Sequence, residues 1–196
     1  DPPFHERHRP VLAQRFFMQP EEQVTALTSA VLVASVHLKS KGSCPETGLN
    51  SNQNDGQACW NAARKEAAGF LAQWLREQME LHSNQLTGGI LLGDFNSYRS
   101  EDPIRAMTRA GLVELVGQHA SPPLYSYVYR GQRGTLDYAF ATPSMIPYLT
   151  LAEHWHVNSD ESDLIHQHSD SSQPQAAWRR FSDHDPLIVD LRFSTH

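Results

Sequence analysis

The residues of this sequence that can do chemistry lie where runs of apolar residues end. They are His37, Asp94, Asn96, Asp137, Asp183 and His184. The carboxylates and the amide offer hard oxygen ligands, which favour Mg²⁺, Mn²⁺ or Ca²⁺ over zinc, and the two imidazoles can transfer protons. Each residue alone is weak evidence, because a lone strand histidine is more often a hydrogen-bonded core residue and an aspartate after a strand usually forms a turn or a helix cap. Their shared position predicts a single site for metal binding and proton transfer.

Apolar patterning predicts the elements that must position these residues. Continuous apolar runs at residues 30–38 and 89–93 are typical of buried strands, and apolar spacing from Trp60 to about Leu81 indicates an amphipathic helix. Further elements expected are a short helix with Asp102 as N-cap, Pro103 in its first turn and its end at Gly111, a hairpin of residues 125–129 and 135–141 around a loop at 130–134, a polar surface loop at 158–175, and a last strand at 186–191. This mixture predicts an α/β or α+β fold in which strand ends converge on one rim of a sheet.

Length and composition predict one compact domain over residues 1–196. Of the 196 residues, 39% are hydrophobic and 19% charged, which is typical of a globular chain. With 16 basic and 22 acidic residues, the net charge of −6 argues against gripping nucleic acid by bulk charge, though not against meeting DNA at a metal site. No apolar run reaches the roughly 18 residues of a membrane span, and the start lacks the basic and apolar regions of a secretory leader. We therefore expect neither a membrane-spanning chain nor an intact secretory precursor.

Two cysteines, Cys44 and Cys59, bracket a polar loop. A lone pair fits a single disulfide better than a zinc site, which needs four ligands, and two free thiols in a cytosolic protein are an equal alternative on spacing alone. Residues 50–56 inside the loop have the oxygen-rich composition of a calcium loop, but the glycine is one place late and no glutamate follows, so a plain polar loop is favoured. The acidic segment 158–163 is likewise expected to be a solvated loop.

Four motifs in order resemble those of the endonuclease/exonuclease/phosphatase superfamily, the group of pancreatic deoxyribonuclease. They are SVHL at 35–38, GDFN at 93–96, GTLDYA at 134–139 and SDHDP at 182–186. Further segments, RPVLAQ at 9–14, HLKSKG at 37–42, CWN at 59–61 and YSY at 125–127, are similar to secreted bacterial extracellular nucleases of that superfamily. The resemblance runs from about Arg9 to Leu191. It implies a metal-dependent phosphodiesterase on a four-layered sandwich of two mixed β-sheets with outer helices.

The resemblance also implies roles for the polar residues around a phosphate and an Mg²⁺ or Mn²⁺ ion, with Ca²⁺ as a third option. Asp94 would orient or activate the attacking water, Asn96 would hydrogen-bond a phosphate oxygen, and Asp183 would bind the metal ion. A water aligned with the leaving oxygen and a neutralised phosphate are what phosphodiester hydrolysis requires.

By the same pattern, His37 and His184 would form an imidazole pair that handles protons and developing charge, with Asp137 accepting a hydrogen bond from His37. Lys39 and Lys41, at the same strand end as His37, are candidates to contact phosphate. Arg64, on the predicted helix, is a weaker candidate for which a salt bridge on the helix face is favoured.

Secretion, either extracellular or periplasmic and in a bacterium, follows from the resemblance, as does the preference for a Cys44–Cys59 disulfide. The implied partner is a nucleic acid substrate, with no membrane. Two alternatives stay open: a phosphodiesterase or phosphatase for a small or lipid head-group substrate, and a catalytically inactive, self-associating fragment.

The sequence departs from the superfamily pattern upstream of His37. Complete members have an N-terminal strand that ends in a metal-binding asparagine, and a later strand with a glutamate that binds the metal and steadies the second histidine. No buried strand before His37 ends in an acidic residue, so about a third of the domain is expected to be missing. We therefore expect weak metal binding, a His184 without its carboxylate partner, and an exposed sheet face that is covered in a homodimer.

Overall fold

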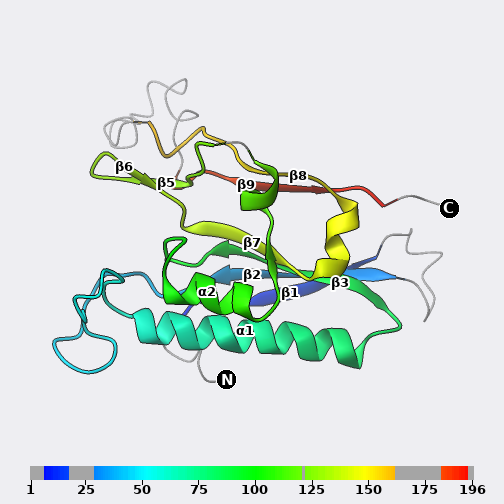
Figure 1. Ribbon diagram of the computed structural model, residues 1–196, viewed down its shortest axis with the longest axis horizontal. Helices are drawn as coiled ribbons and strands as arrows, with labels where there is room; N and C mark the ends of the chain where they lie inside the picture. The colour runs from blue at the N-terminus through cyan, green and yellow to red at the C-terminus, as the bar shows by residue number, and fades with distance from the viewer. Residues whose placement is uncertain (1–6, 18–28, 121, 162–181, 194–196) are drawn as a thin grey trace, which may run out of the picture.

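The structure is a computed structural model that describes residues 7–17, 29–120, 122–161 and 182–193 (Figure 1). Its elements in chain order are β1 (Leu12–Phe17), β2 (Ala30–His37), α1 (Asn61–Leu81), β3 (Leu86–Asp94), α2 (Asp102–Arg109), β4 (Val113–Glu114), α3 (Val116–His119), β5 (Tyr127–Tyr129), β6 (Gln132–Gly134), β7 (Asp137–Ala141), η2 (Pro143–Tyr148), β8 (Leu149–His154) and β9 (Leu187–Leu191). Among the described residues, no helix is long and apolar enough to cross a membrane.

The main sheet has five strands in the order β1-β2-β3-β7-β4. Strands β2 and β3 are parallel and are joined through α1, as a parallel pair requires a crossover, whereas the other neighbours are antiparallel. The register places His37 opposite Asp94 and Asp94 opposite Asp137. Three of the predicted site residues therefore lie side by side in one row across the sheet.

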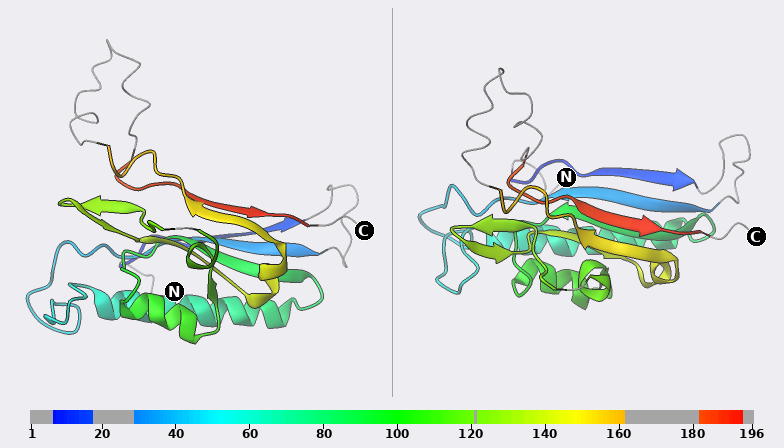
Figure 2. Two further views of the ribbon diagram at one scale, coloured as in Figure 1. Left: turned by 45° about the horizontal axis from the view of Figure 1, so that its top comes forward. Right: turned by 90° about the horizontal axis from the view of Figure 1, so that it is seen from above.

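The five-stranded sheet is the middle layer of the described structure (Figures 1 and 2). Helices α1 and α2 cover one face, where α1 buries residues at helical spacing, among them Ala67, Leu71 and Leu75. The two-stranded sheet β8-β9 covers the other face, where Ala152 of β8 and Ile90 of β3 belong to one buried hydrophobic cluster. The mixed α and β architecture predicted from the sequence is confirmed, with a helical layer, a mixed sheet and small additional sheets in the described part of the chain.

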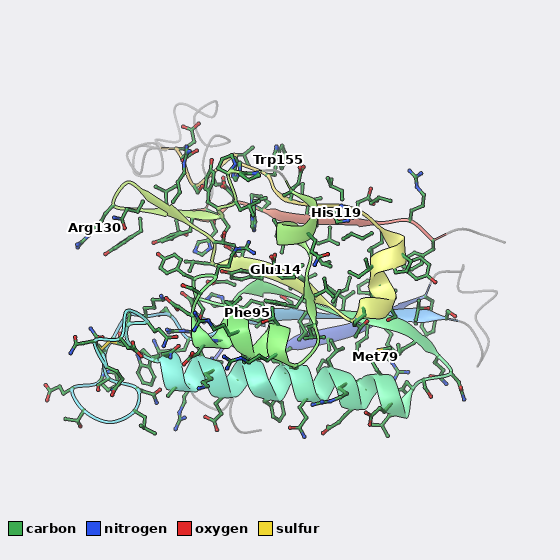
Figure 3. The ribbon with its side chains drawn as sticks, in the orientation of Figure 1. Met79, Phe95, Glu114, His119, Arg130 and Trp155 are labelled. Carbon is green, nitrogen blue, oxygen red and sulfur yellow. A yellow bond between two sulfur atoms is a disulfide. The ribbon has the colours of Figure 1, made fainter. Side chains whose placement is uncertain are left out.

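Phe95 anchors the turn that follows β3 (Figure 3). Its side chain is fully buried, and its ring makes edge-on contacts with Tyr138 and Phe140 of β7 at 5.9 and 5.3 Å between centroids. The backbone N–H of Phe95 donates to the carbonyl of Leu136. Asp94 and Asn96, on either side of this buried ring, are therefore held in place at the end of the sheet.

Gly93 permits the close approach of β2 and β3 at this end. It has φ +132°, and a Cβ atom at this position would overlap the carbonyl oxygen of Val36 on the neighbouring strand. Only glycine fits both conditions, since it has no Cβ and adopts positive φ without strain.

The predicted hairpin is wrong in its pairing. Strand β5 pairs with β6, which falls in the segment expected to be a loop, and residues 137–141 join the five-stranded sheet as β7. Arg130 and Gly131 both have positive φ, so they form the two-residue turn that brings β5 and β6 together directly.

Other boundaries also differ from the sequence predictions. Strands β1 and β8 are absent from the elements that the sequence predicts, and Glu101, not Asp102, is the N-cap position of α2. The predicted strands at 30–38 and 89–93, the helix at 60–81 and the last strand at 186–191 are confirmed with small shifts at their ends. Of the polar loop expected at 158–175, residues 162–175 lie outside the described residues.

Candidate active site

All six predicted chemical residues line one cleft of about 1040 Å³ at the end of the main sheet. They are His37, Asp94, Asn96, Asp137, Asp183 and His184. One wall includes residues of the segment between β2 and α1, and another includes residues of the β5–β6 hairpin. Figure 1 shows both segments at the same end of the sheet, and the views in Figure 2 agree.

Asp94 is held by its neighbour Asn96. The Asn96 backbone N–H donates to Asp94 Oδ1 at 2.7 Å, and the Asn96 side-chain amide donates to Asp94 Oδ2 at 2.8 Å and to the carbonyl of Leu38 at 3.0 Å. Burial, followed by the negative charge of Asp137, raises the pKa of Asp94 to about 6. A cation at this carboxylate would relieve both effects.

His184 pairs with Asp137, because its Nδ1 lies 2.7 Å from Asp137 Oδ2. Burial opposes protonation of this imidazole, but the hydrogen bond and charge of Asp137, with Asp94 and Asp183 nearby, outweigh it and raise the pKa of His184 to about 9. The expectation that Asp137 orients His37, and that His184 lacks a carboxylate partner, is therefore wrong. Asp137 serves the histidine that approaches from the 182–186 segment.

His37 is the more exposed of the two imidazoles, with 52% of its side chain accessible to solvent. Its Nε2 lies 3.6 Å from Asp94 Oδ2. Burial, together with the positive charges of Arg9 and His184, lowers the pKa of His37. The cleft therefore holds one imidazole that favours the neutral form and one that favours the protonated form, which is the division needed for a base and an acid.

One group of three side chains in the described residues has the geometry to hold a metal ion. One ligand atom from each of Asp94, Asp137 and His184 lies within 4.8 Å of the others. Asp183, the predicted metal ligand, lines the same cleft but is not in this group. Because His184 favours the protonated form, the carboxylates are the groups here that can bind a cation, and such hard oxygen ligands fit Mg²⁺ or Mn²⁺ completed by water.

The two lysines predicted to contact phosphate differ in position. Lys41 lines the cleft and forms an ion pair with the buried Glu101. Lys39 does not line it, since its ammonium group lies near Ser40, the carbonyl of Gly42 and the ring of Trp60. Lys41 is the better placed of the two for a phosphate.

Arg64 neither contacts the cleft nor forms a surface salt bridge. Its side chain is completely buried, and it donates to the hydroxyl of Ser97 and to the carbonyls of Lys39, Cys59 and Gln57. The expectation of a helix-face position is wrong because the chain before α1 folds back over this part of the helix. Arg64 instead ties the cleft wall to α1.

A disulfide joins Cys44 and Cys59 and closes the loop between β2 and α1, as the resemblance implied. The indole N–H of Trp60 donates to the carbonyls of Gly42 and Ser43, which also line or adjoin the cleft. Asn52 and Asp55 accept backbone hydrogen bonds from residues two places later, in tight polar turns. These turns shape the polar loop between the two cysteines.

Asp185, the second aspartate of the SDHDP segment, is a structural carboxylate with no role predicted from the sequence. It is buried, and its Oδ1 accepts hydrogen bonds from the backbone N–H groups of Asn158 and Ser159. Its Oδ2 accepts a hydrogen bond from the Ser159 hydroxyl and lies 2.8 Å from His156 Nδ1. Asn158 and Ser159 are buried, so the prediction of a solvated loop is wrong for them. The signal was the second aspartate of the SDHDP segment, which binds the chain beside His184 to residues 156–159.

These contacts place the imidazole–carboxylate pair of His184 and Asp137, and the carboxylate of Asp94, at the end of one sheet. All three residues belong to the four motifs described above. A sequence profile of the endonuclease/exonuclease/phosphatase family matches residues 5–184. The chain belongs to this family. The search of curated proteins found no match.

Several solved structures have a similar fold. The catalytic domain of human nocturnin with a bound sulfate anion is 17% identical, with a TM-score of 0.54. The aligned region covers 94% of this chain and 53% of the nocturnin chain. A 3′-5′ exonuclease from Neisseria meningitidis is 17% identical, with a TM-score of 0.51. The aligned region covers 92% of this chain and 71% of the exonuclease chain. A protein of Enterococcus faecalis is 16% identical, with a TM-score of 0.53 and coverages of 94% and 56%. The chain thus spans little more than half the length of the nocturnin and Enterococcus structures.

Proposed function

We propose that this protein is a divalent-metal-dependent hydrolase that cleaves phosphodiester bonds in DNA or RNA. The observation that carries the proposal is one open cleft in which the carboxylates of Asp94 and Asp183 lie with the hydrogen-bonded pair of His184 and Asp137. Family membership supports hydrolysis of a phosphate ester, and the open cleft can admit a polymer.

The surroundings of each site residue indicate its role in the proposed hydrolysis. Asp94 and Asp183 would hold Mg²⁺ or Mn²⁺ with water, and the ion, when bound, would supply charge neutralisation at the phosphate. Asn96 fixes the Asp94 carboxylate through both of its oxygens. His184, kept protonated by Asp137, would hydrogen-bond a phosphate oxygen and stabilise developing negative charge. His37 in its neutral form would accept a proton at Nε2.

A plasmid-nicking assay tests the proposal. We expect nicking in Mg²⁺ or Mn²⁺, none in EDTA, and a loss of about a hundredfold or more in Asp94→Asn and His184→Ala. Glu77→Gln, which removes an exposed carboxylate of α1, is the matched control and should nick like the wild type. Full activity in EDTA, or in either site variant, would exclude this site as the catalytic centre.

Hydrolysis of bis-p-nitrophenyl phosphate separates the alternatives. Cleavage of this small diester without plasmid nicking would favour a phosphodiesterase or phosphatase for small or lipid head-group substrates. Cleavage of neither, by a folded protein that binds no Mn²⁺, would favour an inactive self-associating fragment.

Compartment and assembly belong to the same proposal. The Cys44–Cys59 disulfide supports an oxidising compartment, such as the periplasm or the outside of a bacterial cell.

Three apolar side chains, those of Leu12, Phe16 and Phe17, are exposed on β1, at the edge of the main sheet, and would be covered in a homodimer. Light scattering of the purified chain tests this assembly, and a monomer at high concentration would exclude it.

A further inference from the structure

Two tyrosines of the β5–β6 hairpin form a row that begins at His184. Tyr127 and Tyr129 are two residues apart on β5, so their side chains lie on the same face of the hairpin. The ring of Tyr127 lies 4.8 Å from that of His184, and the rings of Tyr127 and Tyr129 are 6.3 Å apart with an interplanar angle of 12°. Both tyrosines line the cleft, and Tyr129 is 51% exposed. The row therefore runs from the candidate catalytic centre to solvent.

Positive and aromatic groups accompany this row. The guanidinium of Arg130, at the turn of the hairpin, lies 5.2 Å from the ring centroid of Tyr129 (Figure 3). Tyr98 packs against Gly134 of β6, where a Cβ atom would overlap its ring, and also lines the cleft. Lys41 lies 4.3 Å from the ring centroid of Tyr98. Among the described residues no ion pair involves Arg130, so its charge is available to a ligand anion.

Support of His184 alone does not account for this arrangement. Of the two tyrosines, Tyr127 is the one whose ring contacts His184, and the His184 ring is already fixed by its bond to Asp137. Tyr129 lies one place further along the strand face, presents half of its surface to water and is parallel to Tyr127. Parallel aromatic rings beside a phosphate-handling centre, with a guanidinium at the outer end, have the composition of a base-stacking surface.

We propose that Tyr127 and Tyr129 stack unpaired bases of a nucleic acid strand whose scissile phosphate lies at Asp94 and His184. The proposal rests on the proposed function and adds its substrate class, which is single-stranded or locally unpaired nucleic acid. In a continuous duplex the faces of the bases are covered by their neighbours, so a tyrosine ring can stack on them only after unpairing. Stacking also supplies affinity without net charge, which suits a chain of net charge −6.

The test compares four substrates in Mg²⁺ or Mn²⁺. They are a single-stranded oligonucleotide, the same sequence in a continuous duplex, the same strand with abasic sites flanking the cleaved bond, and bis-p-nitrophenyl phosphate. We expect the single strand to be cleaved faster than the duplex. Tyr129→Ala should lower kcat/KM for the single strand about tenfold or more, leaving the abasic strand and bis-p-nitrophenyl phosphate unchanged. Tyr129→Phe keeps the ring and should retain activity.

Trp155→Ala is the matched control, because Trp155 is an exposed aromatic residue, 56% accessible, that does not line the cleft (Figure 3). It should cleave every substrate like the wild type. An equal loss on bis-p-nitrophenyl phosphate in Tyr129→Ala would assign the ring to support of the centre and overturn the stacking proposal. An equal loss on duplex and single strand, or no loss on either, would also overturn it.

Equilibrium binding keeps the inference separate from the proposed function. Fluorescence anisotropy of a labelled oligothymidine in EDTA measures stacking even if the chain hydrolyses none of the four substrates. Binding that weakens about tenfold in Tyr129→Ala, and not in Tyr129→Phe or Trp155→Ala, supports the stacking surface while failed hydrolysis counts against the proposed function alone. Binding that is absent, or unchanged in Tyr129→Ala, overturns the stacking surface.

Discussion

His184 Nδ1 lies 2.7 Å from Asp137 Oδ2, although the two residues are 47 positions apart in the chain. Asp137 begins β7 next to Asp94. His184 comes from the segment before β9, where its backbone forms an isolated antiparallel β-bridge with Tyr127. The pair fixes the orientation of the imidazole and leaves its Nε2 for other contacts. A carboxylate in the main sheet thus positions the histidine supplied by the end of the chain.

We expect Asp137→Asn to lower the pKa of His184. In the metal-free protein the imidazole of His184 should titrate near pH 9, and the variant should titrate at least one unit lower because the carboxylate charge and its hydrogen bond are lost. NMR of labelled histidine in EDTA measures both. Asp190→Asn, which removes an exposed carboxylate of β9, should leave the His184 titration unchanged, and an unchanged titration in Asp137→Asn would contradict the pairing.

Gly93→Ala should destabilise the fold by about 2–5 kcal/mol, since the new methyl group meets the Val36 carbonyl and neither strand can move without breaking the sheet. Gly48→Ala is the control. Gly48 also has positive φ, +88°, but nothing lies within 4 Å of its added Cβ, so only the backbone cost of about 1 kcal/mol is expected. Urea unfolding of both variants measures the difference, and equal losses would show that the close strand approach is unimportant.

His8 should contribute to stability above its unfolded-state pKa and lose that contribution in acid. Its Nδ1 accepts a hydrogen bond from the backbone N–H of Lys39 at 2.9 Å, and burial lowers its pKa to about 4. Because the folded state binds the proton less readily than the unfolded state, stability present above pH 6.5 falls by about 3 kcal/mol as the pH is lowered to 4.

His8→Asn provides the measurement, because its side-chain carbonyl can accept the same hydrogen bond and does not titrate. Its free energy of unfolding, determined in urea between pH 7 and pH 4, should fall less steeply than that of the wild type. His119→Asn, at an exposed position of α3, should follow the wild type. If the free energy of unfolding of His8→Asn falls with pH as steeply as that of the wild type, the acid sensitivity comes from other groups.

Arg64→Lys should destabilise the protein by about 3 kcal/mol or more, despite keeping the charge. A lysine cannot reproduce the planar set of donors that serves Ser97 and three carbonyls, and would leave those acceptors unpaired in the interior. Arg76→Lys, on the exposed face of the same helix, is the control and should cost less than 0.5 kcal/mol. Thermal unfolding distinguishes the two, and equal melting temperatures would contradict the structural role of Arg64.

The strands and the helix that carry strong periodic or apolar patterns could be predicted from sequence. Residues 30–38 and 89–93 are continuous apolar runs in the centre of the sheet, and α1 buries one regular stripe. Strand β1 could not be predicted in this way, because as an edge strand it has nearly all of its side chains exposed and no alternating pattern. Strand β6 is equally obscure, since its sequence, QRG, has no apolar residue.

The members of the site could be predicted, but their pairing could not. The sequence shows that Asp94 lies at the end of one apolar run and that His184 lies just before the start of another. Polar residues at such strand ends converge at one rim of a sheet. Which histidine faces Asp137 depends on the long-range register of β3 and β7 and on the path of residues 182–186. Local patterning carries no information about either, so the sequence alone does not show that Asp137 pairs with His184 and not with His37.

The bond between Cys44 and Cys59 encloses all of residues 45–58, including the part of the cleft wall at Gly56 and Ala58. A protease that cuts one peptide bond inside this ring therefore releases nothing: the piece carrying β1 and β2 stays joined to the piece carrying α1 and the rest of the sheet. Such a nicked protein migrates as one species of 22.1 kDa on a gel without reductant and as two fragments with it. The loop that carries this part of the cleft wall can thus be cut once while the two fragments stay covalently joined.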